Sequence, residues 1–243
     1  MIDFNLCWQS CWVPILQAIS DGSRDKRTAV RRAAVEALCT AITDKHASAV
    51  PVGVFSTLLK TVVLPTISWL GKDLVRSVME GSWSADEVVE ERSEFRIRSD
   101  LCEPISDIKN KLNVDTARLG ITSRLLTVTS EVIVRQMDRL ALHPTFEGTW
   151  RLILSTYTYF LDAPPPIGEG FDSSLCNVCT ELANTVDTTV ILLKQIIIGL
   201  DRQAQWSKRP ERRGQLWIIT KQATGNLPRC PDLVKELFPS ERA

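Results

Sequence analysis

The sequence predicts an all-α fold built from successive pairs of antiparallel helices. Apolar residues recur at intervals of three and four along nearly every patterned segment, which is the spacing of one face of an α-helix. The chain has 11 glycines and 12 prolines, which are too few for the many tight turns of a β-sandwich or barrel. The connections between several patterned segments are short and polar, which favours antiparallel neighbours that stack rather than close into a bundle.

The first expected helix pair covers residues 6–43. In its first helix, Trp12, Ile15 and Ile19 lie at helical spacing, and Pro14 is near a helix start. A polar turn over residues 21–25 follows. The second helix, over residues 27–43, carries a stripe of mostly small apolar residues that lets another helix approach closely. The stripe consists of Val30, Ala33, Ala34, Ala37, Leu38, Ala41 and Ile42.

A third helix is expected over residues 54–64, with Pro65 bending or interrupting it before Trp69 and Leu70. These segments form a first helical block, residues 1–70. Residues 71–117 are predicted to be an acidic linker or a solvated helix. The acidic residues there are Asp86, Glu87, Glu90, Glu91 and Glu94, with Arg92, Arg96 and Arg98 close by.

A second helical block is expected over residues 118–162. It contains an amphipathic helix over residues 119–140, which ends before His143 and Pro144, and a helix from Trp150 to Leu161. A Pro/Gly linker, residues 163–174, separates it from a last block, residues 175–243. That block starts with a helix over residues 175–200. A basic turn over residues 206–214, a final helix from residue 216 and an apolar end at Phe238 follow.

Helix pairs that recur about every 40 residues are typical of HEAT and armadillo repeats. One pair cannot bury its apolar face alone, so successive pairs stack and share a core. The sequence therefore predicts a HEAT/armadillo-like α-solenoid. In such stacks a turn aspartate and a following arginine can pair, and we expect a charge-assisted contact between Asp21 and Arg31.

The seven tryptophans divide by their surroundings. Trp12, Trp69 and Trp150 lie on apolar stripes and are predicted to be core residues. We expect Trp217 and Phe238 to be structural as well. Trp83 and Trp206 lie in polar surroundings, which makes them the better candidates for contacts with a partner.

Charge and cysteine content exclude several classes of function. The 29 lysines and arginines balance the 29 aspartates and glutamates. The basic excess of a nucleic-acid-binding domain is therefore missing, and no nucleic-acid partner is expected. A spanning helix needs about 20 apolar residues, and the run over residues 190–200 is shorter, so we expect no transmembrane segment. The N-terminus does not resemble a signal peptide. Seven irregularly spaced cysteines predict reduced thiols in the cytosol.

Residues with catalytic or metal-binding potential form no known pattern. His46 and His143 are expected at helix ends. Cys176 and Cys179 form a Cys-x-x-Cys pair, but no second pair is suitably placed for a structural zinc site. Cys7 and Cys11 are interpreted as two small side chains on one helix turn. Phosphate-binding loops, dinucleotide fingerprints and nucleophile elbows are also missing from the sequence. We therefore predict no cofactor, no metal and no catalysis by this chain.

Several stretches, taken in order, resemble the helical region downstream of the catalytic domain in large Arf guanine-nucleotide exchange factors. They are residues 12–19 (WVPILQAI), 25–31 (DKRTAVR), 34–38 (AVEAL), 63–65 (VLP), 118–154, which end in FEGTWRLIL, 216–220 (LWIIT) and 231–239 (PDLVKELFP). The last stretch resembles the Golgi brefeldin-A-resistance factor and GNOM branch. Two departures are Leu64, where the family usually has Phe, and residues 181–184 (ELAN) in place of a Pro-Glu-x-Leu-Lys-Asn pattern.

The resemblance implies a non-catalytic regulatory and scaffold region in Golgi vesicle-mediated transport. In that family a glutamate of the Sec-seven domain performs nucleotide exchange on Arf, and no residue of this sequence matches that domain. The implied partners are small GTPases of the Arf or Rab type, neighbouring domains of the parent protein and the Golgi membrane, contacted peripherally from the cytoplasm. The alternatives are a freestanding HEAT/armadillo adaptor unrelated to Arf, or an enzyme with an unrecognised helical active site.

Overall fold

The computed structural model describes residues 8–44, 50–72, 105–161, 173–202, 210–225 and 227. Every regular element in these ranges is helical, which confirms the predicted all-α fold. The elements are the π-helical turn η1 (Trp8–Trp12), α2 (Val13–Gly22), α3 (Thr28–Thr43), α4 (Val52–Leu58), the π-helical turn η3 (Leu59–Val63), α6 (Ile105–Leu140), α7 (Phe146–Leu161), α8 (Ser173–Asp201) and α9 (Pro210–Thr224). Residues 64–72 continue the helix after η3.

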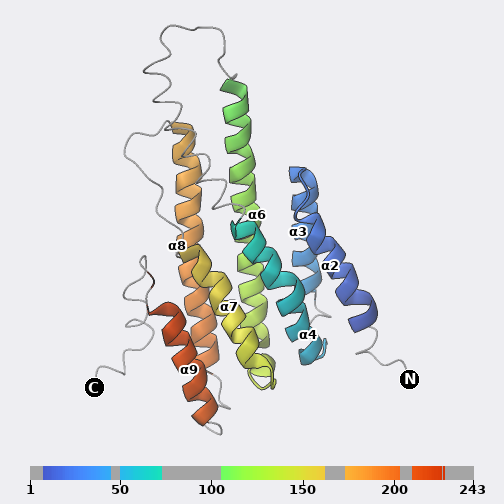
Figure 1. The fold of residues 1–243 in the computed structure, drawn as a ribbon, viewed down its shortest axis with the longest axis vertical. Coiled ribbons are helices and arrows are strands. Elements are labelled where there is room, and N and C mark those ends of the chain that lie inside the picture. Colours follow the sequence, from blue (N-terminus) through green and yellow to red (C-terminus); the bar gives the residue numbers. More distant parts are fainter. Residues whose placement is uncertain are drawn as a thin grey trace.

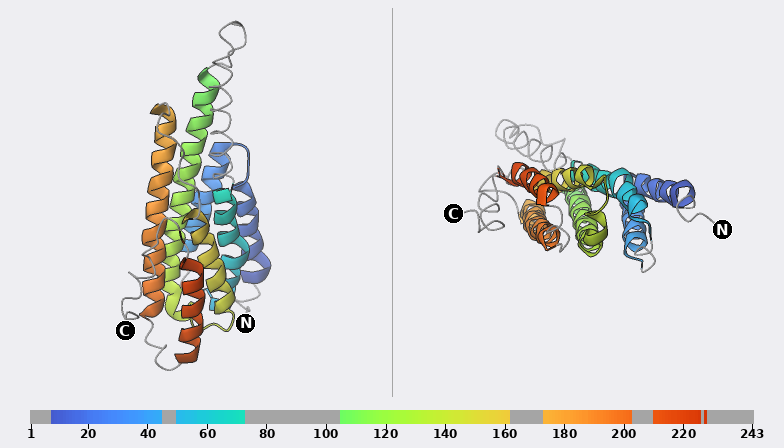
Figure 2. Two further views of the ribbon diagram at one scale, coloured as in Figure 1. Left: turned by 60° about the vertical axis from the view of Figure 1, so that its left-hand side comes forward. Right: turned by 90° about the horizontal axis from the view of Figure 1, so that it is seen from below.

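Successive helices alternate between two layers. Seen from below, α2, α4, α7 and α9 form one layer, and α3, α6 and α8 form the other (Figure 2). Within the first layer η3 contacts both α2 and α7, and α7 contacts α9; within the second, α6 packs between α3 and α8. Contacts between the layers join α2 with α3, α4 with α6, and α7 with α8. The chain therefore crosses from layer to layer while it advances from the α2 side of the molecule to the α9 side (Figure 1).

Two prolines follow π-helical turns at the same distance. The turn η1 ends at Trp12, two residues before Pro14, and η3 ends at Val63, two residues before Pro65. A proline has no N–H, and in an α-helix its ring clashes with the carbonyl four residues earlier. The wider π-helical turn relieves this clash, and such turns occur as local bulges inside α-helices. Val52–Lys72 consequently remains helical throughout its 21 residues, so Pro65 does not interrupt it.

The apolar core lies between the two layers, and α7 contributes its largest side chains. Trp150, Tyr157, Phe146 and Phe160 are all fully buried. The predicted face of α6 is buried opposite them; it consists of Leu126, Ile133, Met137 and Leu140. Full burial of one such side chain stabilises the fold by roughly 1.5–3 kcal/mol. The amphipathic pattern of residues 119–140 therefore identified the central helix of the second layer correctly.

Buried hydroxyl groups connect neighbouring helices of the first layer. Ser20 bonds to Thr66, which joins α2 to the helix at residues 64–72. Ser56 Oγ lies 2.9 Å from Thr149 Oγ1, which joins α4 to α7. Both serines and threonines are small, so the helices approach closely while their hydroxyls remain hydrogen-bonded, as buried polar groups require. The contacts within this layer are thus partly polar.

Several element boundaries differ from the expected ones. The helix α6 begins at Ile105, so residues 105–117, which were predicted to be part of an acidic linker or a solvated helix, are helical and belong to it. The helix α8 begins at Ser173, inside the expected Pro/Gly linker. The helix α9 begins at Pro210, so the end of the expected basic turn is helical, with proline in the first position that tolerates it. The acidic run at residues 86–94 and the prolines at 164–166 lie outside the described residues.

Two helices have the length and apolar content of a membrane span, contrary to the expectation from the sequence. They are Val52–Lys72 and Ala183–Asp201. Much of each segment is buried inside the described fold, and the core helices of proteins without a membrane pass the same test. Many of their apolar side chains belong to the core between the two layers, although Ile191 and Ile198 of the second segment are exposed.

Candidate functional site

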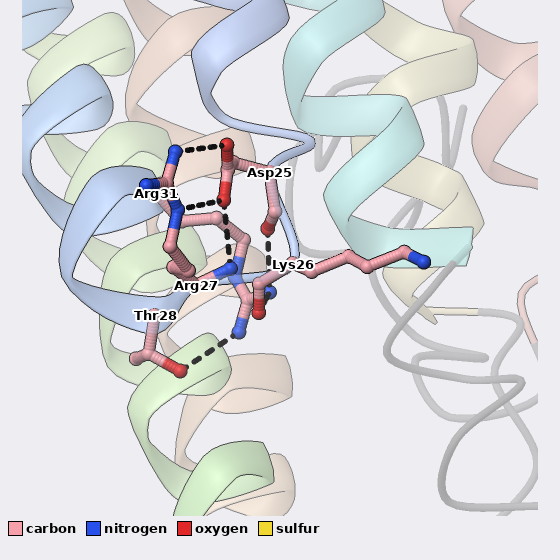
Figure 3. A network of polar contacts seen from close by, with 5 residues as sticks. All are labelled: Asp25, Lys26, Arg27, Thr28 and Arg31. Carbon is pink, nitrogen blue, oxygen red and sulfur yellow. Dashed lines mark hydrogen bonds and ion pairs between the residues drawn. The ribbon is translucent and has the colours of Figure 1, made fainter.

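The most organised polar cluster in the described structure is the loop between α2 and α3 (Figure 3). The guanidinium of Arg27 donates two parallel hydrogen bonds to the carboxylate of Asp25, from Nε to Oδ1 and from Nη2 to Oδ2, each 3.0 Å long. The backbone N–H of Arg27 donates a third bond to Oδ1 at 2.8 Å. These bonds favour the charged carboxylate and lower the pKa of Asp25 from 3.8 to about 2. The same pair raises the pKa of Arg27.

Arg31 attaches this loop to the first turns of α3. Its side chain is buried, and Nη1 donates to the carbonyl oxygens of Asp25 at 2.8 Å and of Lys26 at 3.0 Å. Nη2 donates to Thr28 Oγ1 at 3.1 Å. A guanidinium carries several donors in a fixed planar arrangement, so one side chain can hold consecutive carbonyls of a tight loop. Arg31 therefore fixes the geometry from which the neighbouring side chains project.

The predicted contact between Asp21 and Arg31 needs correction. The structure gives Arg31 the carbonyls of residues 25 and 26 as partners. The carboxylate of Asp21 lies 4.0 Å from Arg24, and its side chain is 68% exposed at the end of α2. The arginine was identified correctly as a structural residue. Its partner is different because the loop just before α3 folds back onto the guanidinium, while Asp21 stays at the surface.

Exposed cations surround the loop and give this edge of the molecule a positive charge. Residues 21–32 contain five basic and two acidic residues, whereas the whole chain has a net charge of zero. Arg24, Lys26 and Arg32 are exposed, and the guanidinium carbon of Arg24 lies 5.8 Å from the ring centroid of Trp69. This distance fits a cation–π contact. The loop thus offers ordered positive charge beside a half-buried aromatic ring, which suits contact with an acidic surface.

The tryptophans do not all lie where the sequence predicted. Trp150 is fully buried, and its Nε1 donates to Thr220 Oγ1 at 3.0 Å, which confirms its core role and connects α7 to α9. Trp12 is 46% exposed, so the prediction that it belongs to the core is wrong. Its helix lies at one end of the described stack, with no neighbour on its outer side in that part of the chain (Figure 1). Trp69 and Trp217 are half-buried and pack against the core.

Four other candidate residues lie outside the described residues. They are the two predicted partner-contact residues, Trp83 and Trp206, together with Phe238 and His46. Their predicted roles therefore stay predictions. His143 follows the end of α6, as expected for a helix-end residue, and its Nδ1 lies 2.9 Å from Thr145 Oγ1.

Two buried titratable groups, Cys39 and Tyr157, have the properties of structural residues. Burial raises the pKa of the Cys39 thiol to about 11, so this cysteine is a poor nucleophile at neutral pH. Burial also raises the pKa of Tyr157, whose hydroxyl bonds to Ser130. Cys11 is a free thiol at the surface. Among the described residues, no group of three or more His, Cys, Asp or Glu side chains could hold a metal ion.

The spacing of Asp25 and Arg27 in the sequence is a local signal for the loop cluster. Asparagine and aspartate in turns accept hydrogen bonds from the backbone N–H two residues later. Asp25 and Arg27 have this spacing, and the side chain of Arg27 adds the ion pair. A second missed residue is Arg139, whose Nη2 donates to the carbonyl of Val50 at 2.8 Å and so ties α6 to the start of α4. That contact joins residues far apart in the sequence, so spacing could not reveal it.

The fold and these surfaces define the chain as an all-α protein in which two layers of helices display ordered polar loops. In comparisons with known proteins, the chain matches no family model, no curated protein and no solved structure. A functional assignment must therefore rest on the architecture, on the loop cluster and on the sequence resemblance.

Proposed function

We propose that the chain is a helical-repeat scaffold of the HEAT/armadillo-like α-solenoid type, which acts by binding other proteins. The observation that carries this proposal is that the described helices alternate between two layers and that neighbouring elements within each layer contact one another. Stacked helix pairs produce this arrangement, because each pair buries its apolar face on the next. A closed bundle would bring the first helices into contact with the last.

We further propose that the scaffold is a regulatory region of an Arf guanine-nucleotide exchange factor at the Golgi. The ordered sequence resemblance supports this assignment, and its segments include important packing residues. The segment FEGTWRLIL forms the first turns of α7 with fully buried Phe146 and Trp150, and LWIIT lies in α9 with Thr220 bonded to Trp150. Nucleotide exchange itself would be performed by a Sec-seven domain outside this sequence.

The loop between α2 and α3 is the surface we assign to protein contact. Its shape is held by Arg31 and by the Asp25–Arg27 pair, so little order must be gained on binding. Its exposed cations would favour an acidic surface on a small GTPase of the Arf or Rab type or on a neighbouring domain. Peripheral association with the Golgi membrane would follow from these partners.

Two experiments test the proposal at its two levels. An antibody against residues 164–174 should detect a cellular protein several times larger than 27.2 kDa, and its transcript should encode a Sec-seven domain. A cellular protein of 27.2 kDa would remove the Arf assignment and leave a freestanding helical-repeat adaptor, which is the alternative function.

The second experiment measures binding to purified Arf and Rab proteins, loaded with GDP or GTP, by biolayer interferometry. Lys26→Glu should weaken binding by about tenfold, whereas Arg135→Glu, which changes an exposed cation on α6, should not. Equal effects of the two variants, or no binding to any GTPase, would contradict the role assigned to the loop.

A further inference from the structure

The loop between α2 and α3 carries exposed positive charge that the described residues do not neutralise. Lys26 and Arg32 are exposed, and neither forms an ion pair with a described acidic residue. The carboxylate of Asp25 is already engaged by Arg27, and the side chain of Lys26 projects away from this cluster (Figure 3). Cations close to one another attract anionic groups to the surface they share. The loop is therefore suited to bind an acidic group that lies outside the described residues.

The helical segment Val52–Lys72 ends beside this loop. The ring centroid of Trp69 lies 5.8 Å from the guanidinium carbon of Arg24, and Lys72 is exposed about one helical turn after Trp69. We call the exposed cations of this region the basic patch, which consists of Arg24, Lys26, Arg32 and Lys72. The chain consequently continues beyond Lys72 from a point at the basic patch.

The acidic run at residues 86–94 has the opposite charge and a regular spacing. It contains five acidic residues and one arginine. Four of its glutamates recur at intervals of three and four, so a helix through them would carry all four on one face; they are Glu87, Glu90, Glu91 and Glu94. Like charges at this spacing repel one another and destabilise a helix. Contact with a basic surface would remove that repulsion.

The length of chain between Lys72 and Asp86 brings the acidic run within reach of the basic patch. A chain of that length spans roughly 20 Å, whether it forms an α-helix or a random coil. Binding of a segment tethered in this way is intramolecular, and a short linker gives it an effective concentration on the order of millimolar. A separate acidic molecule would have to compete with that concentration. The chain's own acidic run is therefore the favoured occupant of the basic patch.

We propose that the acidic run binds the basic patch of its own chain and so occupies the surface assigned to protein contact. The inference rests on the proposed function, in which the same loop binds the acidic surface of a small GTPase or a neighbouring domain. The acidic run would then be an internal competitor, and the contact would be autoinhibitory. The contact itself requires no partner, so it is measured separately from the proposed function.

A synthetic peptide of residues 84–94, labelled for fluorescence anisotropy, tests whether the patch is already occupied in the full chain. The comparison is with a glutamine variant of the full chain, which carries Glu87→Gln, Glu90→Gln, Glu91→Gln and Glu94→Gln. This variant should bind the peptide about tenfold or more tightly than the wild type, because its own run no longer competes. Lys26→Glu in the glutamine variant should remove most of that gain. The matched control is Arg135→Glu, which changes an exposed cation on α6 and should leave the gain intact.

Zero-length carbodiimide cross-linking of the wild type provides an independent measurement. The reagent joins an amine to a carboxylate only where the two are in direct contact. Mass spectrometry should identify a cross-link between Lys26 and a glutamate of the acidic run. Lys60 is the control amine, because its Nζ donates to the carbonyl of Thr145 at 3.3 Å and it lies three helical turns before Lys72.

Tighter peptide binding by the glutamine variant, together with the Lys26 cross-link, would support the proposal. Equal affinities of wild type and glutamine variant would overturn it, as would cross-links to Lys60 without one to Lys26. Equal losses from Lys26→Glu and Arg135→Glu would also overturn it, because the attraction would then be non-specific.

Binding to purified Arf and Rab proteins separates this inference from the proposed function. GTPase affinity about tenfold higher in the glutamine variant than in the wild type would support autoinhibition. GTPase binding that is equal in both proteins would overturn autoinhibition and leave the scaffold function standing. The internal contact without any GTPase binding would do the reverse.

Discussion

The helix at Val13–Gly22 and the helical segment Val52–Lys72 share a local design but differ in their surroundings. A five-residue π-helical turn directly precedes the first and lies within the second, and each turn ends two residues before a proline. The second segment lies between two neighbours of its layer, α2 and α7, and most of its residues are buried. Among the described residues the first has such a neighbour, η3, on one side only, and Trp12 and Ile15 are exposed.

The difference shows which properties are local. The π-helical turn before a proline follows from the chemistry of proline, and it occurs in both places regardless of neighbours. Burial depends on the position of a helix in the stack. An apolar stripe therefore predicts a contact surface reliably, but it does not reveal whether the described chain itself supplies the other side of that contact.

The largest expected effect contrasts an interior tryptophan with an end tryptophan. Trp150→Ala should lower the free energy of unfolding by roughly 3–5 kcal/mol, because it leaves a large cavity and removes the hydrogen bond from Nε1 to Thr220 Oγ1. Trp12→Ala should cost about 1 kcal/mol or less, because the side chain is half exposed. Urea unfolding of dilute protein measures both values. Similar costs for the two variants would contradict the distinction between interior and end positions.

The next largest effect is expected at Gly71, in the helical segment Val52–Lys72. A Cβ added to Gly71 would lie 2.6 Å from the ring of buried Phe160, so Gly71→Ala should destabilise the protein by about 1–3 kcal/mol. Gly120→Ala is the control, because no atom lies within 4 Å of its added Cβ. Alanine reduces the backbone freedom of the unfolded chain, so this change should stabilise the protein by about 0.4–1 kcal/mol. Melting temperatures that shift in the same direction would disprove this packing.

Substitutions at two adjacent residues of α6 should change the free energy of unfolding in opposite directions. Thr129 is buried, and its hydroxyl has no hydrogen-bond partner in the described structure, so Thr129→Val should raise the free energy of unfolding by about 1 kcal/mol. The Ser130 hydroxyl bonds to the carbonyl of Leu126 at 2.8 Å and to Tyr157, so Ser130→Ala should lower it by about 1 kcal/mol. Chemical denaturation distinguishes the two signs, and a loss of stability in Thr129→Val would show that its hydroxyl is satisfied.

The smallest expected effect concerns the loop between α2 and α3. The pKa of Asp25 is about 2 in the folded protein and near its ordinary value of 3.8 in the unfolded chain. The ion pair with Arg27 therefore contributes fully above about pH 4, and the contribution is lost as the pH falls through 2. NMR titration of the Asp25 carboxyl carbon should give the low midpoint, and Arg27→Ala should return it toward 3.8. A wild-type midpoint near 3.8 would argue against the paired loop geometry.

Much of the helical architecture was predictable because it depends on local patterns. The alanine-rich stripe placed α3 within one residue of its observed start, and the β-branched run at residues 188–191 did not prevent helix α8 from forming. The sequence left residues 105–117 as part of an acidic linker or a solvated helix, because they are mostly polar and lack a strong apolar face. A mostly polar helix leaves only a weak signal in the sequence.

The functional cluster was predictable only in part. Arg31 was recognised as structural, but its partners are backbone carbonyls, which every residue carries and no sequence pattern distinguishes. The pairing of Arg24 with Trp69 and of Arg139 with Val50 joins separate elements. Such contacts are decided when helices dock, so they could not be derived from spacing along the chain.

The sequence by itself determined the helices, the prolines that require π-helical turns, and the apolar faces that must be covered. The tertiary structure decided which faces are covered, because burial depends on the order in which helices alternate between the two layers. It also decided that Trp150 lies in the core while Trp12 lies at the surface. Both tryptophans lie on apolar stripes, but only Trp150 is fully buried, because α7 packs against α8, α9 and η3.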